Sequence, residues 1–297
     1  MTNATAAPIP DLPCYLNGEW ATLSTAKVSV LDRGFIFGDG VYEVVPAYDG
    51  RPFRFAEHMA RLDRSLGELR IANPMRHDEW HALVMKLIAA YAAHMRVAAE
   101  STHQLVYLQV TRGVAMRDHV MPPGLTPTVF AMSNRLHIYT AEERARGVAC
   151  VTHEDFRWKK GHIKSISLAA AVLARQVSAD VGANETLMFR DGYLTEAAAS
   201  NVWVVKDGKV LGAPRGNLVL EGIRYGLLEE LCGEAGIPFE LRPVSREEVL
   251  AADEILLSSA TKEVVPCTQL DGRPVGNGRP GPIYDRLYAG YQRAKQR

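Results

Sequence analysis

Five dipeptides constrain the fold of this chain more than any other feature of its sequence. In each of the five, asparagine or aspartate directly precedes glycine between two strand-like segments: Asn17-Gly18, Asp49-Gly50, Asp191-Gly192, Asp207-Gly208 and Asp271-Gly272. Both central residues of a type I′ turn have positive φ angles, which these residue types tolerate. The dipeptides therefore predict five β-hairpins, and hairpins join antiparallel strands. We expect antiparallel or mixed sheets and not a doubly wound parallel sheet.

The first 130 or so residues predict a mixed α+β unit. The segment 32–40 is too rich in glycine and aspartate for an ordinary strand, and 112–119 is a loop dense in cationic groups. Alternation and composition predict strands at 15–20, around a turn, and at 27–31, 41–45, 51–55, 104–111 and 128–132. Helices are predicted at 57–69 and 78–94.

The polar segment 134–147 is predicted to be an irregular linker between two domains. A small α+β domain, 14–133, precedes it, and a larger cofactor-binding domain, 148–297, built on an antiparallel or mixed sheet, follows it. Residues 1–13 are expected to form a disordered lead. The larger domain is predicted to have strands at 148–152 and 254–257, helices at 168–174, 223–235 and 244–252, and a C-terminal helix. Gly236 should end one helix, and Ser245 should begin the next.

Composition excludes several classes of partner. Lys+Arg and Asp+Glu both number 34, so nothing indicates binding to nucleic acid or to an anionic membrane. No apolar run approaches membrane-spanning length. The four cysteines lie far apart without CxxC spacing, which argues against a metal site or a disulfide framework and favours a reducing cytoplasm. The N-terminus lacks the basic and apolar regions of a signal peptide.

Lys164 is the first candidate for chemistry. It lies between Ile163 and Ile166, and the alanine-rich run 168–174 predicts a buried helix because apolar residues lie nearly all round it. Apolar surroundings favour the neutral amine of a lysine, which suits Schiff-base chemistry. For one lysine alone, a snorkelling side chain at a helix end, with a packed stem and a solvated charge, is the more common case.

Further residues suit a flat ligand that carries an anion. Glu196 is followed by small residues, which suits a flat group packed on backbone as well as it suits a solvated turn. Gly222 opens a predicted helix, where N–H groups and the dipole favour an anion, although an ordinary helix start looks the same. The run 258–261 offers hydroxyl and N–H groups, or a helix cap. Arg61 on its own indicates a surface charge.

Taken together, these candidates have a pattern. One lysine for a Schiff base, one carboxylate for a ring nitrogen and three possible phosphate contacts are the parts that a pyridoxal phosphate site requires.

The chain resembles the fold-type IV pyridoxal phosphate enzymes, the class IV aminotransferases. Within them it is most similar to the D-amino-acid aminotransferases, and the resemblance runs from about residue 15 to 290 in family order. The motifs that carry it are Asp32-Arg33-Gly34, Phe37-Gly38-Asp39-Gly40-Val41-Tyr42-Glu43-Val44, Glu57-His58, Arg61-Leu62, Thr111-Arg112-Gly113, Arg117-Asp118-His119, Arg157-Trp158, Ile163-Lys164-Ser165, Thr195-Glu196, Ser200-Asn201, and Leu220 with Gly222-Ile223.

The resemblance implies a role for each matching residue. Lys164 would bind the cofactor covalently and carry the proton between the α-carbon and the cofactor, and Glu196 would hold the pyridine nitrogen protonated. Leu220 would pack on the ring. The other implied cofactor contacts are Arg61, Ser200, Asn201, Gly222, Ile223, Arg224, Ser259, Ala260 and Thr261. Tyr42, Val44, Arg117 and His119 would bind the substrate, Tyr42, Arg117 and His119 as a trap for its carboxylate.

The sequence departs from the family at a few positions. The family often has threonine where Arg224 stands, so one hydroxyl for the phosphate is missing although backbone contacts could survive. Ser167 and the run Ala197-Ala198-Ala199 replace more polar residues common in the D-alanine enzymes. These changes could alter the hydrogen bonds around Glu196 or the lysine.

The resemblance implies a homodimer, in which the Arg117 loop comes from the partner subunit, and the cysteine usage favours a cytoplasmic protein. The expected reaction exchanges the amino group between a D-amino acid, such as D-alanine, and a 2-oxo acid, such as 2-oxoglutarate. Branched-chain L-amino-acid aminotransferases usually lack the Arg-x-His loop, so Arg117 and His119 count against that alternative. Aminodeoxychorismate lyase uses the same cofactor site and stays open. A non-catalytic protein that binds the cofactor would be favoured by loss of the lysine or the glutamate, and both are present.

Overall fold

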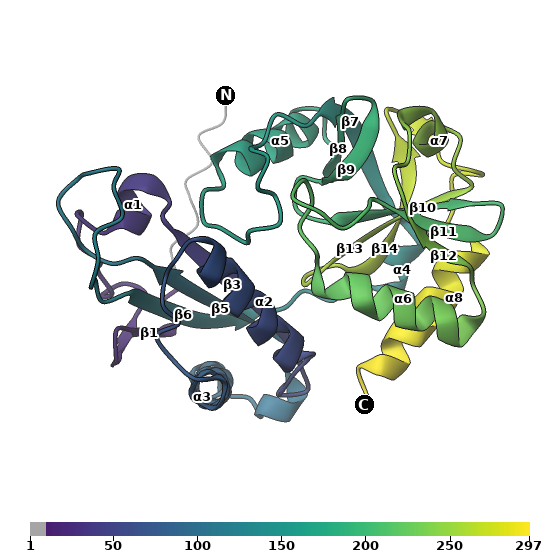
Figure 1. The fold of residues 1–297 in the computed structure, drawn as a ribbon. Helices are drawn as coiled ribbons and strands as arrows, with labels where there is room; N and C mark the ends of the chain where they lie inside the picture. The colour runs from purple at the N-terminus through teal and green to yellow at the C-terminus, as the bar shows by residue number, and fades with distance from the viewer. Residues whose placement is uncertain (1–9) are drawn as a thin grey trace, which may run out of the picture. The chain divides into compact units, whose positions relative to one another are not determined.

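A computed structural model of the protein describes residues 10–297. The chain divides between Leu136 and His137 into two compact units, here called unit 1 and unit 2 and described separately (Figure 1). Residues 1–9 of the predicted disordered lead lie outside the described residues. Of the rest of that lead, Asp11 accepts a hydrogen bond from Ser24 Oγ at 2.6 Å, and Leu12 is buried, so both belong to unit 1.

Unit 1 is built on one antiparallel sheet. Its six strands lie in the order β2-β1-β6-β5-β3-β4. They are β1 (Pro13–Leu16), β2 (Glu19–Thr22), β3 (Gly40–Tyr48), β4 (Arg51–Pro52), β5 (Gln104–Thr111) and β6 (Thr128–Arg135). The predicted strands on both sides of the Asn17-Gly18 turn, and those at 41–45, 104–111 and 128–132, are confirmed. Of the predicted strand 51–55, only Arg51–Pro52 is a strand, and Phe55 already begins a helix.

Two helices cover one face of this sheet. They are α2 (Phe55–Glu68), which packs on β3, and α3 (His77–Met95), which packs on β1, β5 and β6; a short 3₁₀ helix, η1 (Ala99–Ser101), follows α3. Alternate strand residues such as Val41, Val106 and Ala131 are buried against Leu62 and Trp80 of these helices. The side chains of opposite parity on the strands, among them Tyr42 and Tyr107, therefore lie on the other face of the sheet.

The five predicted hairpin turns are confirmed. The Asn or Asp of each dipeptide has a φ angle between 49° and 52°, and the glycine that follows also has a positive φ. Both angles are therefore positive, as in a type I′ turn, whose twist matches that of the flanking strands. The local sequence therefore specifies these connections in both units.

Of two expectations for the segment before β3, one is wrong and the other is confirmed. The predicted strand at 27–31 is wrong, because Ser29 turns the chain: its Oγ accepts from Leu31 N at 3.1 Å and its carbonyl from Asp32 N at 2.9 Å. The glycine-rich segment after it forms a short helix, α1 (Arg33–Phe37), capped by the Asp32 side chain and ended by Gly38 at φ 68°.

Unit 2 is built on a nine-stranded mixed sheet. Its order is β12-β11-β10-β13-β14-β7-β8-β9, with β15 paired to β14. Most neighbours are antiparallel, but β11–β12, β14–β7 and β7–β8 are parallel. The strands are β7 (Val148–Glu154), β8 (Glu185–Arg190), β9 (Tyr193–Ala197), β10 (Asn201–Lys206), β11 (Lys209–Gly212), β12 (Phe239–Leu241), β13 (Glu254–Ser259), β14 (Glu263–Leu270) and β15 (Arg273–Pro274). The expected α+β class with antiparallel and mixed sheets is confirmed.

Five helices accompany this sheet. They are α4 (Ala141–Arg146), α5 (Ala169–Asp180), α6 (Ile223–Ala235), α7 (Arg246–Leu250) and α8 (Pro282–Ala294). Gly236 ends α6 in the left-handed region, and Ser245 caps α7, as predicted. None of the helices in residues 10–297 has the length and apolarity needed to cross a membrane.

Helix α4 corrects the prediction that 134–147 is irregular. Thr140 caps its first turn and Glu143 bonds back to the backbone of Thr140, which is a capping box. The signal for this helix is therefore present in the sequence at Thr140 and Glu143. The residue limits of the domains and of their linker stay a prediction.

Helix α5 is where predicted, but its predicted burial is wrong. Only Ala174 and Ser178 of its twelve residues are buried, whereas Val172 and Leu173 are 64% and 61% exposed. One stripe of the helix packs on β8, where Thr186 Oγ1 donates to the carbonyl of Ala174 at 2.7 Å. Apolar residues on all sides of a helix therefore do not by themselves show that the helix is buried on all sides.

Candidate active site

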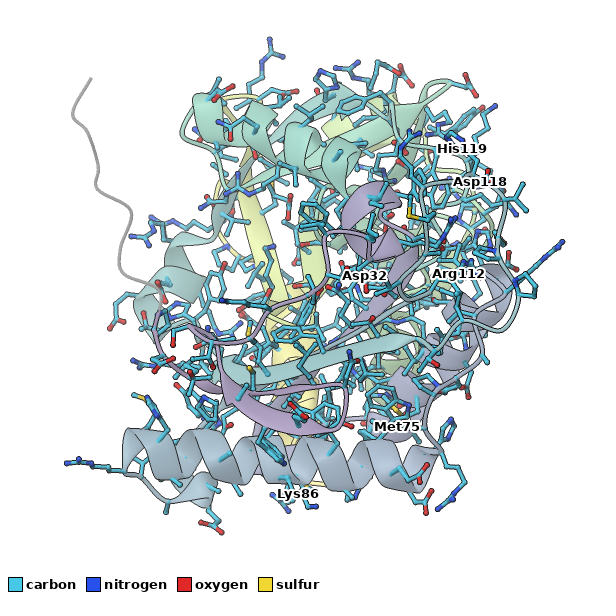
Figure 2. All side chains as sticks on the ribbon, turned by 90° about the vertical axis from the view of Figure 1, so that its left-hand side faces the viewer. Asp32, Met75, Lys86, Arg112, Asp118 and His119 are labelled. Carbon is cyan, nitrogen blue, oxygen red and sulfur yellow. The ribbon has the colours of Figure 1, made fainter. Side chains whose placement is uncertain are left out.

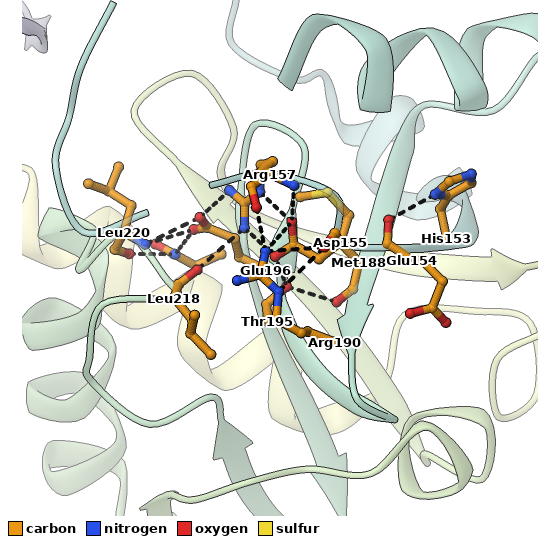
Figure 3. Close-up of polar contacts among 11 residues, drawn as sticks. His153, Glu154, Asp155, Arg157, Met188, Arg190, Thr195, Glu196, Leu218 and Leu220 are labelled. Atoms are coloured by element: carbon orange, nitrogen blue, oxygen red, sulfur yellow. Dashed lines mark hydrogen bonds and ion pairs between the residues drawn. The ribbon is translucent and has the colours of Figure 1, made fainter. Parts of the chain in front are cut away.

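The carboxylate of Glu196 is the centre of a hydrogen-bond network in unit 2 (Figure 3). Glu196 lies on β9 and is 5% exposed. Arg157 Nη1 donates to its Oε1 at 2.6 Å, and Asn201 Nδ2 donates to its Oε2 at 3.1 Å. Leu220 N lies 3.2 Å from both oxygens. Three donors therefore fix the orientation of this carboxylate.

Arg157 links Glu196 to a second buried carboxylate. Its Nε and Nη2 donate to Asp155 Oδ1 and Oδ2, both at 2.9 Å, and Thr195 Oγ1 donates to Asp155 Oδ2 at 2.9 Å. Burial works against ionisation of Asp155, but the guanidinium holds its pKa below the usual range. Burial raises the pKa of Glu196, and Arg157 opposes that rise. Sequence reasoning assigned no role to Arg157, because 39 residues separate it from Glu196.

Lys164 lies in the irregular segment between β7 and α5. It is half-buried, between the buried residues Ile163 and Ser165. Close before it, Gly161 N donates to the carbonyl of Asn217 at 2.8 Å. Three residues after Asn217, the N–H of Leu220 bonds to Glu196. One loop, 217–220, therefore ties the segment of the predicted lysine to the network of the predicted carboxylate.

The N-terminus of α6 adjoins the same network. Gly222 caps the helix without a side-chain hydrogen bond, and Ile223 and Arg224 form its first turn. A Cβ at Gly222 would overlap Asn201 Oδ1, so any residue larger than glycine requires this amide to shift. The Arg224 side chain is buried and donates from Nη2 to the hydroxyl of Tyr291 at 3.0 Å. Backbone N–H groups of such a helix end suit a phosphate.

Ser259 is the last residue of β13, and Ala260 and Thr261 begin the tight turn to β14. The hydroxyls of Ser259 and Thr261 lie 3.2 Å apart. At the end of the same turn, Lys262 Nζ donates to Glu185 Oε2 at 3.0 Å and to Ser200 Oγ at 2.9 Å. Ser200, predicted as a cofactor contact, is therefore hydrogen-bonded within this cluster, while Asn201 beside it in the chain bonds to Glu196.

Arg61 is held by a buried carboxylate in unit 1. Its Nε and Nη2 donate to Glu43 Oε1 and Oε2 at 2.7 and 2.8 Å, and His58 Nδ1 lies 2.8 Å from Glu43 Oε2. Glu43 is fully buried, which disfavours its charge, but Arg61 and His58 hold its pKa well below the usual range. Arg61 is therefore part of a buried ion pair and not the surface charge that it would be by default.

Tyr42 and Val44 lie on the face of the unit 1 sheet opposite the helices. Both are half-buried residues of β3. The rings of Tyr42 and Tyr107 stack with their centroids 5.8 Å apart, and Val44 pairs with Tyr107 in the β3–β5 register. Burial, with a smaller contribution from the neighbouring phenol of Tyr42, raises the pKa of Tyr107 to about 12.

Arg117 and His119 lie on the loop between β5 and β6. Both side chains are exposed, and both contact the ring of Phe37. Arg117 Cζ is 5.4 Å from the centroid of that ring, and the centroid of the His119 ring is also 5.4 Å from it. Figure 2 shows Asp118 and His119 farther along this loop than Arg112, where the loop begins. The structure thus brings the two predicted carboxylate ligands of this loop to one aromatic side chain.

Residues 40–270 match the family model described as amino-transferase class IV. The chain is 36% identical over 276 residues to D-alanine aminotransferase of Bacillus licheniformis, covering 93% of this chain and 94% of that protein. It is 35% identical over 280 residues to D-alanine aminotransferase of Staphylococcus epidermidis, covering 94% and 96%.

Solved structures of branched-chain amino acid aminotransferases have the same fold. The Escherichia coli enzyme aligns with a TM-score of 0.84 at 25% identity, covering 94% of this chain and 93% of that one. The Thermoproteus uzoniensis enzyme aligns with a TM-score of 0.81 at 23% identity, covering 95% and 94%. The family match over most of the sequence, and relatives above 30% identity over nearly its whole length, show that this chain belongs to the class IV aminotransferases.

Proposed function

We propose that this protein exchanges the amino group between a D-amino acid, such as D-alanine, and a 2-oxo acid, such as 2-oxoglutarate. The observation that carries the proposal is the pair Arg117 and His119 on one loop of unit 1, together with relatives that are D-alanine aminotransferases. A guanidinium can bind a carboxylate through two parallel hydrogen bonds, and an imidazole can add a donor. Fixing the carboxylate decides which mirror arrangement of the amino acid is accepted.

Class IV aminotransferases use pyridoxal phosphate, and the residues of unit 2 fit this group. A glycine-capped helix start at Gly222 suits its phosphate, and the Ser259 turn offers hydroxyls nearby in the same unit. The buried carboxylate of Glu196 suits a protonated ring nitrogen. We propose that these residues hold the cofactor, with Leu220 packed on its ring.

When bound, pyridoxal phosphate supplies a carbonyl that takes up the amino group and a ring that withdraws electrons from the α-carbon. Glu196 holds the proton on the ring nitrogen, and its hydrogen bonds from Arg157 and Asn201 keep it in one orientation. Lys164 Nζ would accept the proton from the α-carbon of the substrate and carry it between that carbon and the cofactor. Arg117 and His119 bind the substrate carboxylate.

The homodimer and the cytoplasmic location also belong to this proposal. In unit 1, an isolated β-bridge pairs the backbone of Asp32 with that of Val114. The two segments around this bridge, 30–35 and 114–120, expose large apolar side chains. Val30, Phe35, Met116 and Val120 are each at least 70% exposed. Such a patch is typical of a protein interface, which supports a second copy of the chain as partner. The four cysteines are unpaired, which supports a reducing compartment.

A substrate panel tests the proposal. The purified enzyme is offered D-alanine, L-leucine and L-valine with 2-oxoglutarate, and aminodeoxychorismate alone with pyruvate as the readout. Transfer from D-alanine with little from the L-amino acids is expected. A preference for L-leucine or L-valine would replace this function with that of a branched-chain enzyme, and release of pyruvate would indicate the lyase.

Cofactor attachment is tested separately. Borohydride fixes the cofactor irreversibly to the lysine that carries it, and peptide mapping then locates the label. We expect the label on Lys164 and not on the exposed residues Lys159 and Lys160. A label on either of these two would overturn the assignment of Lys164, and an unlabelled protein would favour a non-catalytic role.

A further inference from the structure

The backbone between Arg117 and His119 is held by a buried arginine. Arg33 is 3% exposed; its Nη1 donates to the carbonyl of Asp118 at 2.6 Å and its Nε to Asp39 Oδ2 at 2.8 Å. Asp39 also accepts from Arg112 Nε at 2.7 Å and Nη2 at 3.0 Å. Arg33 therefore connects the exposed part of the loop to the ion pairs that Asp39 makes with the two buried arginines, Arg33 and Arg112.

The Phe37 ring contacts both this buried arginine and the two exposed side chains. Arg33 Cζ is 4.8 Å from the ring centroid, Arg117 Cζ is 5.4 Å from it, and the His119 ring is 5.4 Å away at 42°. Phe37 is the last residue of α1, whose start is capped by Asp32 and whose end is fixed by Gly38. The short capped helix therefore fixes the ring that both loop side chains contact.

A ring contact leaves the hydrogen-bonding groups of an arginine available. The guanidinium approaches an aromatic ring through its π-face, whereas it binds a carboxylate through N–H groups at its edge. An exposed arginine loses side-chain conformational entropy when it is ordered. A ring that orders Arg117 beforehand reduces this loss at the moment of binding.

We propose that Phe37 is a positioning residue for the substrate carboxylate. Its ring holds Arg117 and His119 in the orientation that binds the carboxylate, and so sets the affinity for the amino acid and the preference for one mirror form. The inference rests on the proposed function, because it assigns Phe37 a part in the binding that the function assigns to Arg117 and His119.

The test compares Phe37→Leu, which keeps apolar bulk and removes the ring, with Phe37→Trp, which keeps an aromatic face. A cation–π contact at an exposed site is worth a factor of about two to five. Phe37→Leu should raise KM for D-alanine by that factor with a smaller change in kcat, and Phe37→Trp should restore KM. Trp20→Leu is the control, since Trp20 is an exposed aromatic residue on β2 of the same unit and has no part in the proposed binding of the carboxylate.

A double-mutant cycle separates positioning from a general loss of structure. The effect of Arg117→Ala on kcat/KM should be smaller in the Phe37→Leu background than in the wild type by about the same factor of two to five. Additive effects, or an unchanged KM in Phe37→Leu, would overturn the inference. If Phe37→Leu unfolds, Phe37→Met carries the same comparison. A wild-type enzyme without D-alanine transfer would overturn the proposed function instead, so the two failures differ.

Discussion

Arg157 Nη1 lies 2.6 Å from Glu196 Oε1, and the same guanidinium binds Asp155 through two further hydrogen bonds (Figure 3). The pair sits in the interior of unit 2, where Glu196 is 5% exposed. Burial alone would favour the neutral acid, and the guanidinium favours the carboxylate. Arg157 therefore favours the charged form of Glu196, which is the form that can stabilise a protonated ring nitrogen.

Glu196→Gln keeps the shape of the side chain and removes its charge. The amide can no longer hold a proton on the ring nitrogen by its charge, so we expect kcat to fall by at least about tenfold while the cofactor still binds. Steady-state kinetics and a spectral titration with pyridoxal phosphate measure the two quantities. Near-wild-type turnover would mean that Glu196 is only structural.

Arg117→Ala should raise KM for D-alanine and leave cofactor binding unchanged. A charge-assisted bidentate contact is worth roughly 1.5–3 kcal/mol, so kcat/KM should fall about ten- to a hundredfold and the preference for D- over L-substrates should weaken. Arg64→Ala is the matched control, because Arg64 is an exposed arginine on α2 of the same unit. An equal loss in both variants would argue against a specific role of Arg117.

Gly222→Ala tests the close contact at the start of α6. The added Cβ would overlap Asn201 Oδ1, and Asn201 in turn donates to Glu196 and to the carbonyl of Leu220. We expect a loss of about 1–3 kcal/mol in the free energy of unfolding and weaker cofactor binding. Urea unfolding of the apoprotein and a cofactor titration measure these effects.

Gly233→Ala in the same helix is the control for this substitution. A Cβ at Gly233 meets nothing within 4 Å, so alanine should stabilise the helix by about 0.5–1 kcal/mol. The changes in the free energy of unfolding should therefore have opposite signs in Gly222→Ala and Gly233→Ala. Stabilisation by both would show that Asn201 moves aside at no cost.

Glu43→Gln should change how stability depends on pH. The folded pKa of Glu43 lies below its usual value of 4.5, because Arg61 and His58 outweigh the effect of burial. The stabilisation is therefore complete above about pH 4.5 and is lost as the pH falls below that value. At pH 7 the variant leaves Arg61 without its carboxylate, at a cost of about 3–5 kcal/mol.

Urea unfolding between pH 3 and pH 7 measures this dependence. The free energy of unfolding of the wild type should decline below pH 4.5 more steeply than that of the variant. Parallel curves would mean that the carboxylate of Glu43 has the same pKa in the folded and unfolded protein. Glu68→Gln is a suitable control, since Glu68 is an exposed residue at the end of α2.

The sequence by itself determined the parts of the fold that depend on neighbouring residues. The Asn-Gly and Asp-Gly dipeptides specified five hairpins because the required φ angles are a local property of those residue types. Gly236 and Ser245 marked helix ends for the same reason. The family motifs identified the class of enzyme, and the matches to known relatives agree with it.

Only the tertiary structure decided which distant residues meet. Arg157 and Glu196 are 39 residues apart, and Phe37 and Arg117 are 80 apart, so no local pattern indicates either contact. Segment 27–31 alternates like a strand but forms none, because the Ser29 hydrogen bonds turn the chain. Strand pairing, side-chain burial and the pairing of charges depend on residues that are distant in the sequence. Those residues come into contact only when the sheets and helices pack.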